Sequence, residues 1–343
     1  MYKSYFHLTK NPFEITPDPA FLFPTRKHND ALAALYYAIR QRKGFVVLTG
    51  EVGTGKTLLI RCLLDYFKCN EIAYAYVFDS CLSPLEFLQF IAADFGMESS
   101  GKNKSELLHA LGRYLISRHQ QGLTTVLVVD EAHLLSPDVL EEIRLLTNLE
   151  TSQEKLLQIV LAGQPQLADK LSRPSLGQLR QRISVLSSLA PLPYAETERY
   201  MEHRLRVAGY RSGTPFTAAA KRLIADISDG IPRNINNLCF GALSLGYALQ
   251  QRTIDADVIR EVVADLDLSK LASDSRASSI DEAAVLQKLK SDLDLVTLDK
   301  KTILARTEQF DTDARKDVPS VAEAQAYIQQ IIQLLNNWQR SVN

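Results

Sequence analysis

Cysteine is scarce in this chain of 343 residues, and its spacing excludes the usual roles of clustered cysteines. The four cysteines are Cys62, Cys69, Cys81 and Cys239, and no two of them form a C-x-x-C pair. The sequence therefore predicts neither a zinc site nor a disulfide framework. We expect reduced thiols, as in the cytosol.

An excess of charge of one sign is also missing, because 39 Lys and Arg residues face 40 Asp and Glu residues. This balance gives no global sign of a nucleic-acid or acidic-membrane partner. The overall balance does not exclude a local basic patch on the surface.

Long apolar runs are lacking as well. The nearest candidate, Leu238 to Leu249, falls well short of the roughly 20 residues that span a bilayer, and it predicts a buried helix. Residues 1–10 are polar and aromatic, unlike a signal peptide. We expect a cytoplasmic protein with no integral membrane segment.

One loop stands out among the motifs that are present. The run Gly50-Glu51-Val52-Gly53-Thr54-Gly55-Lys56-Thr57 fits the pattern G-x-x-x-x-G-K-[ST] of a phosphate-binding loop. An apolar run at 45–49 predicts a buried strand before it, and Leu58 begins a stretch with helical periodicity after it. Strand, glycine loop and helix are the setting that this motif requires.

The chemistry of phosphate binding explains these residue types. Glycines let the backbone turn tightly and direct N–H groups into one concavity, and the following helix presents its positive end there. Lys56 is expected to reach the β- and γ-phosphates, and Thr57 to offer its hydroxyl to Mg²⁺. The sequence thus predicts binding of a nucleoside triphosphate by residues 50–58.

A second motif follows the apolar run 124–129, which predicts a central strand. Asp130 at the end of this strand is expected to hold Mg²⁺ through water, and Glu131 to polarise the attacking water. Further strands are predicted at 72–78, 156–162 and 183–189. Helices are predicted at 28–40, 84–95, 105–119, 140–149 and 176–182. The pattern is that of an α/β domain with a five-stranded parallel sheet.

Four further residues are candidates for contacts with a γ-phosphate. Gln164 follows the strand at 156–162, so a polar side chain there would lie between the acids and the phosphate loop. Arg180 and Arg182 end a helix, where they are either surface charges or groups that reach a neighbouring subunit's γ-phosphate. Arg233 opens a later helix and would face the phosphates from a second domain.

The chain changes character at Pro191-Leu192-Pro193. Helical patterns then cover 197–208, 217–228, 235–250 and 256–266. We predict an N-terminal arm at 1–27, a nucleotide-binding α/β domain at 28–190, a helical lid at 191–268 and an extension at 269–343. The aromatic, proline-rich arm is expected to pack on the core or to lie near the nucleotide base.

These features resemble an AAA+ ATPase of the ExeA type, also called general secretion pathway protein A. The resemblance extends from residue 1 to about 268 and includes Asn11-Pro12-Phe13 and Pro17-Asp18-Pro19 in the arm. It also includes GFVVLTGEVGTGKT, VVDEAHLL, LAGQPQL, LRQRI and GIPRNINNLC. ATP rather than GTP is implied by this resemblance alone.

The resemblance implies roles for the same residues. Lys56 and Thr57 would bind the phosphates and Mg²⁺, and Asp130 and Glu131 would serve the metal and the water. Gln164 would be the first sensor and Arg233 the second. Arg180 or Arg182 would be the finger offered to the next subunit.

The resemblance also implies a function, that of a bacterial ATPase that works as a ring or another oligomer and drives assembly of a partner complex. Members of the secretion type carry a spanning helix and a periplasmic part after the ATPase. No such segment is expected here, which puts a secretion role in question and leaves a peripheral place at the inner membrane.

Two other function classes stay open. One is an ATPase of the transposition type that forms filaments on DNA, for which Arg199, Arg204, Arg206 and Arg211 are candidate contacts. The other is a nucleotide-dependent scaffold with negligible hydrolysis.

The C-terminal extension carries two helix signals. Ser279 and Ser320 each begin a capping-box pattern, and apolar residues follow at spacings of three and four, ending at Trp338. We expect a helical hairpin or coiled coil that either packs on the lid or docks an unidentified protein partner through 280–343.

Overall fold

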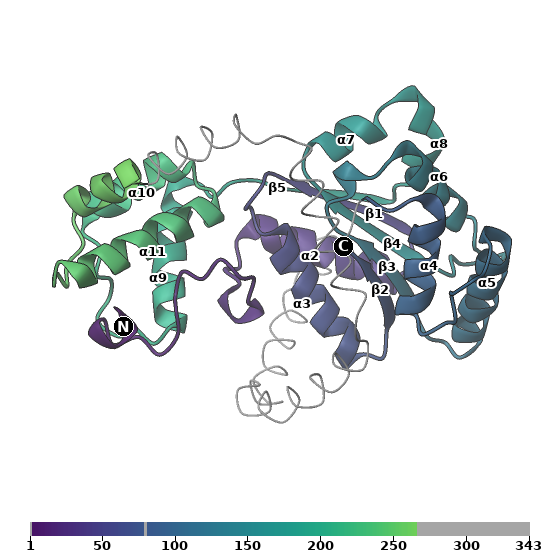
Figure 1. The fold of residues 1–343 in the computed structure, drawn as a ribbon, viewed down its shortest axis with the longest axis horizontal. Helices are drawn as coiled ribbons and strands as arrows, with labels where there is room; N and C mark the ends of the chain where they lie inside the picture. The colour runs from purple at the N-terminus through teal and green to yellow at the C-terminus, as the bar shows by residue number, and fades with distance from the viewer. Residues whose placement is uncertain (1, 79–80, 266–343) are drawn as a thin grey trace, which may run out of the picture. The chain divides into compact units, whose positions relative to one another are not determined.

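A five-stranded sheet forms the centre of the computed structural model, which describes residues 2–78 and 81–265 (Figure 1). The strands are β1 (Phe45–Gly50), β2 (Ala73–Val77), β3 (Thr125–Val129), β4 (Gln158–Gly163) and β5 (Val185–Leu189). Their order is β2-β3-β4-β1-β5, and every pairing is parallel. The predicted α/β fold with five parallel strands is confirmed.

The register of the strands explains why both faces of the sheet are apolar. Val47 lies opposite Leu161, Leu161 opposite Val129, and Val129 opposite Val77. Because side chains alternate along a strand, these residues share one face, where they join a buried cluster with residues of the helices α4 (Pro84–Asp94), α5 (Lys104–Gln120) and α6 (Pro137–Leu146). The alternate residues, such as Leu48, are equally buried and face the layer that holds α2 (Arg26–Arg40) and α3 (Lys56–Cys69) (Figure 1).

The helices of this domain begin where the sequence provides caps. Ser83 and Asn103 form capping boxes with Glu86 and Glu106, which satisfy backbone N–H groups at the start of α4 and α5. The helices are α2 (Arg26–Arg40), α3 (Lys56–Cys69), α4 (Pro84–Asp94), α5 (Lys104–Gln120), α6 (Pro137–Leu146), α7 (Gln166–Leu171) and α8 (Gly177–Arg180).

In the sheet domain, two helix predictions were wrong in their bounds. The helix expected at 140–149 is α6, which starts earlier because Ser136 accepts a hydrogen bond from the Val139 N–H at 3.3 Å and Pro137 suits the first turn. The helix expected at 176–182 is shorter, and α7 before it was not predicted. Leu171 and Leu176 both enter the core cluster, and their spacing of five residues does not fit a continuous helix. The chain turns there through the 3₁₀ helix η3 (Pro174–Leu176).

After residue 193 the described chain is mostly helical, as the sequence predicts. It contains α9 (Tyr194–Val207), α10 (Ala218–Ser228) and α11 (Pro232–Ala248), and residues 256–265 are also helical. The N-terminal arm includes α1 (Tyr2–Tyr5) and the 3₁₀ helix η1 (Pro19–Phe21). Ring contacts of Tyr2 with Phe240 and of Phe13 with Phe216 hold the arm against these helices. The arm thus packs on the helical part of the chain.

Arg204 of α9 holds the arm in place from within. Its side chain is only 5% exposed. Its Nε donates to the carbonyl of Pro12, its Nη2 to the carbonyl of Glu14 at 3.3 Å, and its Nη1 to the Tyr200 hydroxyl at 2.9 Å. The guanidinium also lies 4.7 Å from the ring centre of Phe21. Listing Arg204 among candidate DNA contacts was therefore wrong, because its donors are used inside the protein.

Two predictions lie outside the described residues: the extension at 269–343, and within it the helices expected after Ser279 and Ser320. Within residues 2–78 and 81–265, no helix is long and apolar enough to cross a bilayer.

We predict that Arg204→Ala lowers the free energy of unfolding by about 3 kcal/mol, because it leaves buried carbonyl groups without donors. Arg206→Ala on the same helix, at an exposed position, should change it by less than about 0.5 kcal/mol. Urea unfolding followed by circular dichroism measures both. Equal transition midpoints for the two variants would contradict the assigned role of Arg204.

Candidate functional site

The loop between β1 and α3 turns at two glycines. Gly53 and Gly55 have φ values of +82° and +103°, which residues with a Cβ rarely adopt. Gly55 is the N-cap residue of α3 and supplies no side-chain hydrogen bond to the helix. Unlike α4 and α5, α3 therefore begins with backbone N–H groups that no cap satisfies, and a helix end of this kind attracts an anion.

Lys56 lies across this loop. Its side chain is buried, and its Nζ donates to the carbonyls of Gly50 at 2.8 Å and Glu51 at 3.0 Å. Burial lowers the pKa of Lys56, and the carboxylates of Glu131, Asp130 and Glu51 oppose this shift. The charge of Lys56 is thus held beside the N-terminus of α3, where phosphate charge would be balanced.

Asp130 accepts hydrogen bonds on both of its carboxylate oxygens. Thr57 Oγ1 donates to Oδ2 at 3.0 Å, the Tyr76 hydroxyl donates to the same oxygen at 3.2 Å, and the Glu131 N–H donates to Oδ1 at 2.9 Å. The sheet therefore brings together the two residues that were predicted to serve Mg²⁺. A hydroxyl and a carboxylate are hard oxygen donors of the kind that Mg²⁺ prefers, so this pair fits the ion.

Tyr76 was not identified from the sequence, where it reads only as a strand residue. Burial raises its pKa to about 12, and the nearby charge of Asp130 acts in the same direction. Its hydroxyl consequently stays protonated and remains a donor to Asp130 at neutral pH.

Glu131 follows Asp130 in the left-handed backbone region, with φ at +48°. Its side chain is 43% exposed overall, yet its Oε2 atom is buried and has no hydrogen-bond partner in the described part of the chain. His133 Nδ1 lies 3.4 Å from this oxygen and accepts the backbone N–H of Gln164 at 3.4 Å. Burial lowers the pKa of His133, so a neutral ring lies beside an acceptor that a water molecule could satisfy.

The structure places Gln164 at the end of the central strand β4 and Arg233 beside the phosphate loop. Gln164 follows β4, which pairs with β3 on one side and β1 on the other. Arg233, in the first turn of α11, donates its backbone N–H to the Gly53 carbonyl at 3.3 Å, and its side chain is exposed. The start of α11 thus contacts the phosphate loop directly.

The two candidate finger residues differ in their surroundings. Arg182 is half-buried, and its Nη1 donates to Thr147 Oγ1 at 2.8 Å within the same chain. Arg180, at the end of α8, is exposed, and its side chain makes no hydrogen bond or ion pair with other described residues. Of the two, Arg180 is the arginine whose donors are available to another molecule.

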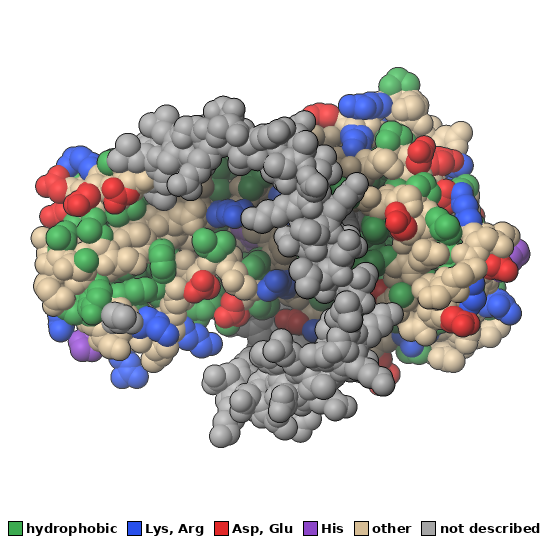
Figure 2. All heavy atoms as spheres, in the orientation of Figure 1, with side chains coloured by type: hydrophobic (Ala, Val, Ile, Leu, Met, Phe, Trp, Pro, Cys, Tyr) green, Lys and Arg blue, Asp and Glu red, His purple; other side chains and the backbone are tan. Residues whose placement is uncertain are grey.

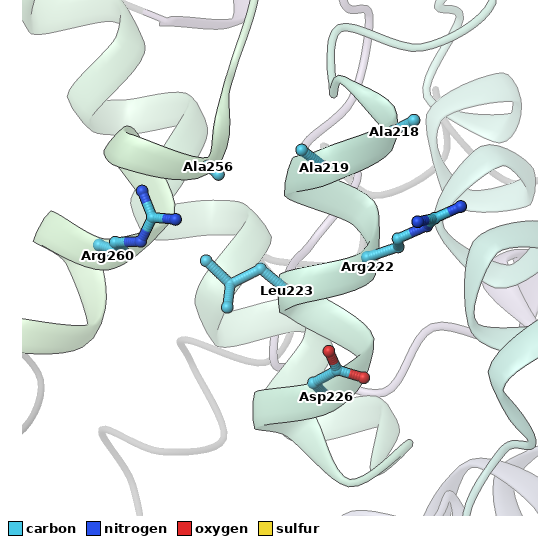
Figure 3. A pocket seen from close by; sticks show the side chains of 7 residues that line it. All are labelled: Ala218, Ala219, Arg222, Leu223, Asp226, Ala256 and Arg260. Atoms are coloured by element: carbon cyan, nitrogen blue, oxygen red, sulfur yellow. The ribbon is translucent and has the colours of Figure 1, made fainter.

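A separate cavity lies in the helical part of the chain. Its volume is about 440 Å³, and its lining comes from α10 and the helix that begins at residue 256. Figure 3 shows Leu223 extending toward Ala256 and Arg260. None of the predicted phosphate, metal or sensor residues lines it, so it is distinct from the candidate site.

Comparisons with known proteins agree with the geometry of this site. A family model described as "AAA domain" matches residues 39–171. General secretion pathway protein A of Aeromonas hydrophila is 42% identical over 249 residues, which cover 72% of this chain and 45% of that protein. ATP-dependent target DNA activator B of Escherichia phage Mu is 30% identical over 131 residues, which cover 38% of this chain and 39% of that protein. This chain thus spans less than half the length of either relative.

Among solved structures, the ORC1 protein of Aeropyrum pernix in complex with DNA aligns with a TM-score of 0.60 at 16% identity. The alignment covers 95% of this chain and 87% of that chain. At this level of identity the likeness shows the fold alone.

The parallel sheet, the phosphate loop and the matched domain define an AAA+ protein. The similarity to general secretion pathway protein A assigns it to the ExeA type of AAA+ ATPase, which confirms the resemblance seen in the sequence.

Gly53 offers a test of the contact between the loop and α11. A Cβ at Gly53 would lie 2.5 Å from the Cβ of Arg233, whereas Gly101 has a similar φ of +73° with open space around it. We predict that Gly101→Ala costs about 1–2 kcal/mol of stability through backbone strain alone, and that Gly53→Ala costs about 1–3 kcal/mol more through overpacking. Urea unfolding compares the two; equal costs would mean that the loop and α11 are not in firm contact.

Proposed function

We propose that this chain binds ATP with Mg²⁺ and hydrolyses it as an oligomeric AAA+ ATPase that drives assembly or remodelling of a partner complex. The observation that carries the proposal is the uncapped start of α3 beside Lys56, with the Thr57–Asp130 pair on the same side of the loop. An anion site, a cation and a site for Mg²⁺ thus meet at one place.

Each residue has a definite task in this proposal. The N–H groups at the uncapped start of α3 bind the β-phosphate, and Lys56 exchanges its carbonyl partners for phosphate oxygens. Thr57 and Asp130 would hold Mg²⁺. Mg²⁺, when bound, neutralises charge that develops on the phosphates.

Glu131 orients the water that attacks the γ-phosphate. The Oε2 atom of Glu131 is buried and has no hydrogen-bond donor among the described residues. This supports the role, because a buried carboxylate oxygen is stabilised when it accepts a hydrogen bond from water. Gln164 and Arg233 act as sensors on the two sides of the γ-phosphate. Their positions beside β1 and Gly53 support this assignment.

An oligomer would complete the site through Arg180. This side chain is exposed, and a guanidinium suits the charge of a phosphoryl group in the transition state. Arg182 supports the position of α8 through Thr147 instead. The ATPase is proposed to work in the cytoplasm, and a protein partner that docks through 280–343 stays a prediction.

A second candidate function is supported by the similarity to the DNA activator of phage Mu. In this case the oligomer forms on double-stranded DNA. On the face seen in Figure 2, the Lys and Arg side chains of the described residues are interspersed with acidic ones. A nucleic-acid contact on this face would therefore be local, and its affinity would fall steeply with salt.

For the purified chain we predict that Glu131→Gln binds ATP but loses turnover by at least about 100-fold, because the water is no longer oriented. Light scattering of this variant should show growth in particle mass with ATP. Growth that requires added double-stranded DNA would favour the second candidate.

Lys56→Ala serves as the matched control, and it should bind ATP weakly and leave the mass unchanged. Normal turnover by Glu131→Gln would contradict the role assigned to Glu131. Absence of turnover in the wild type would instead favour a nucleotide-dependent scaffold.

A mixing experiment tests the shared site. Lys56→Ala and Arg180→Ala should each be inactive alone, and an equimolar mixture should recover about a tenth or more of the wild-type rate, since an intact Arg180 can serve an intact Lys56 in a neighbour. A mixture of Arg182→Ala with Lys56→Ala is the control, and its ATPase rate should not exceed the sum of the rates of the two variants measured alone. Full activity of Arg180→Ala by itself would exclude the finger role.

A further inference from the structure

A buried histidine contacts the phosphate loop from behind. His28 lies in the first turn of α2, the helix that precedes β1, and is 6% exposed. Its Nε2 lies 3.0 Å from the carbonyl oxygen of Thr54, and its Nδ1 lies 2.6 Å from Thr25 Oγ1. Both ring nitrogens are thus engaged, one by the cap of α2 and one by the loop.

The partners determine where the ring carries its proton. A backbone carbonyl only accepts hydrogen bonds, so Nε2 must be the donor to Thr54. Thr25 Oγ1 already accepts the backbone N–H of His28 at 3.1 Å, and its own proton is free to be donated to Nδ1. The arrangement fits a neutral imidazole with the proton on Nε2, and burial lowers the pKa of His28 in agreement with this form.

Because the peptide unit is planar, the contact of His28 with the Thr54 carbonyl also fixes the direction of the Gly55 N–H. The Thr54 carbonyl and the Gly55 N–H belong to one planar trans peptide unit and point in opposite directions. Holding the carbonyl on His28 therefore directs the Gly55 N–H away from the ring. This N–H has no hydrogen-bond partner among the described residues, and it lies immediately before the uncapped start of α3.

The loop has little other support at this peptide. The Thr54 side chain and N–H both bond to the Glu51 carbonyl, at 2.8 and 3.3 Å, and the Gly55 carbonyl accepts the Leu59 N–H at 3.0 Å. These bonds hold the groups on either side; within the described residues, rotation of the Thr54–Gly55 peptide itself is opposed by the hydrogen bond from His28. A Cβ at Gly55 would lie 3.2 Å from His28 Nε2, so the ring approaches a residue with no side chain. Glycine makes such rotation easy.

We propose that His28 is a positioning residue that fixes the Thr54–Gly55 peptide so that the Gly55 N–H faces the phosphates of the bound nucleotide. The inference rests on the proposed function, since it concerns the nucleotide site. A residue that only filled the core would be replaceable by any side chain of similar volume, whereas this role requires a donor at Nε2.

The test compares His28→Leu, which removes the donor, with His28→Gln, which keeps an amide donor. Calorimetric titration of the full chain with ATP and ADP should show affinity about tenfold weaker for His28→Leu and within about threefold of the wild type for His28→Gln. Adenosine, which has no phosphate, should bind all three proteins equally. Wild-type ADP affinity in folded His28→Leu, or equal losses in the two variants, would overturn the proposal.

Two measurements keep the inference testable by other routes. If His28→Leu does not fold, Thr25→Ala should weaken ADP binding and Thr25→Ser should not, because only serine retains the hydroxyl that orients the ring. Equal binding by these two variants would count against the proposal.

In nucleotide-free protein with ¹⁵N-labelled glycine, the chain gives amide signals from only 15 glycines. The Gly55 signal should be sharp in the wild type and in His28→Gln, and broadened or split in a variant without the donor. An unchanged signal would overturn the inference, even if the wild type binds no nucleotide and the proposed function fails.

Discussion

The parallel alignment of β1, β3 and β4 is the constraint on which the candidate site depends. Parallel strands end at the same edge of a sheet, and here the strand order places β4 between the strand that leads to the phosphate loop and the strand that leads to the acids. Thr57 and Asp130 are 73 positions apart in the chain, and their side chains meet at 3.0 Å. A slip of either strand by one residue would turn its core residues to the opposite face of the sheet, so burial of both faces fixes the chemistry at the edge.

Much of this architecture could be predicted because it is written in local patterns. The loop motif, the apolar strands and the helical periodicities are contiguous signals, and the structure confirms the strands and most of the helices that they predict. The bounds of the helices predicted at 140–149 and 176–182 were wrong because the signals that set the true bounds are a single serine–proline pair and an irregular spacing of leucines. Local periodicity does not decide such cases.

The supporting residues around the site could not be predicted for a different reason. Tyr76, His28 and His133 act through contacts made across the fold, and each has an ordinary sequence neighbourhood. Arg204 shows the opposite failure, because an arginine on a polar helix reads as exposed until the arm is folded over it. Burial of a polar side chain is a property of the tertiary structure, and one sequence carries little sign of it.

The missing cap of α3 has a thermodynamic consequence. In α4 and α5 the protein itself satisfies the first N–H groups, so those helix starts have their full stability at any ligand concentration. In α3 that stabilisation is left to an external anion, and the free energy of folding becomes a function of the free anion concentration and its dissociation constant. The uncapped start of α3 is thus a point at which the composition of the surrounding solution enters the stability of the whole domain.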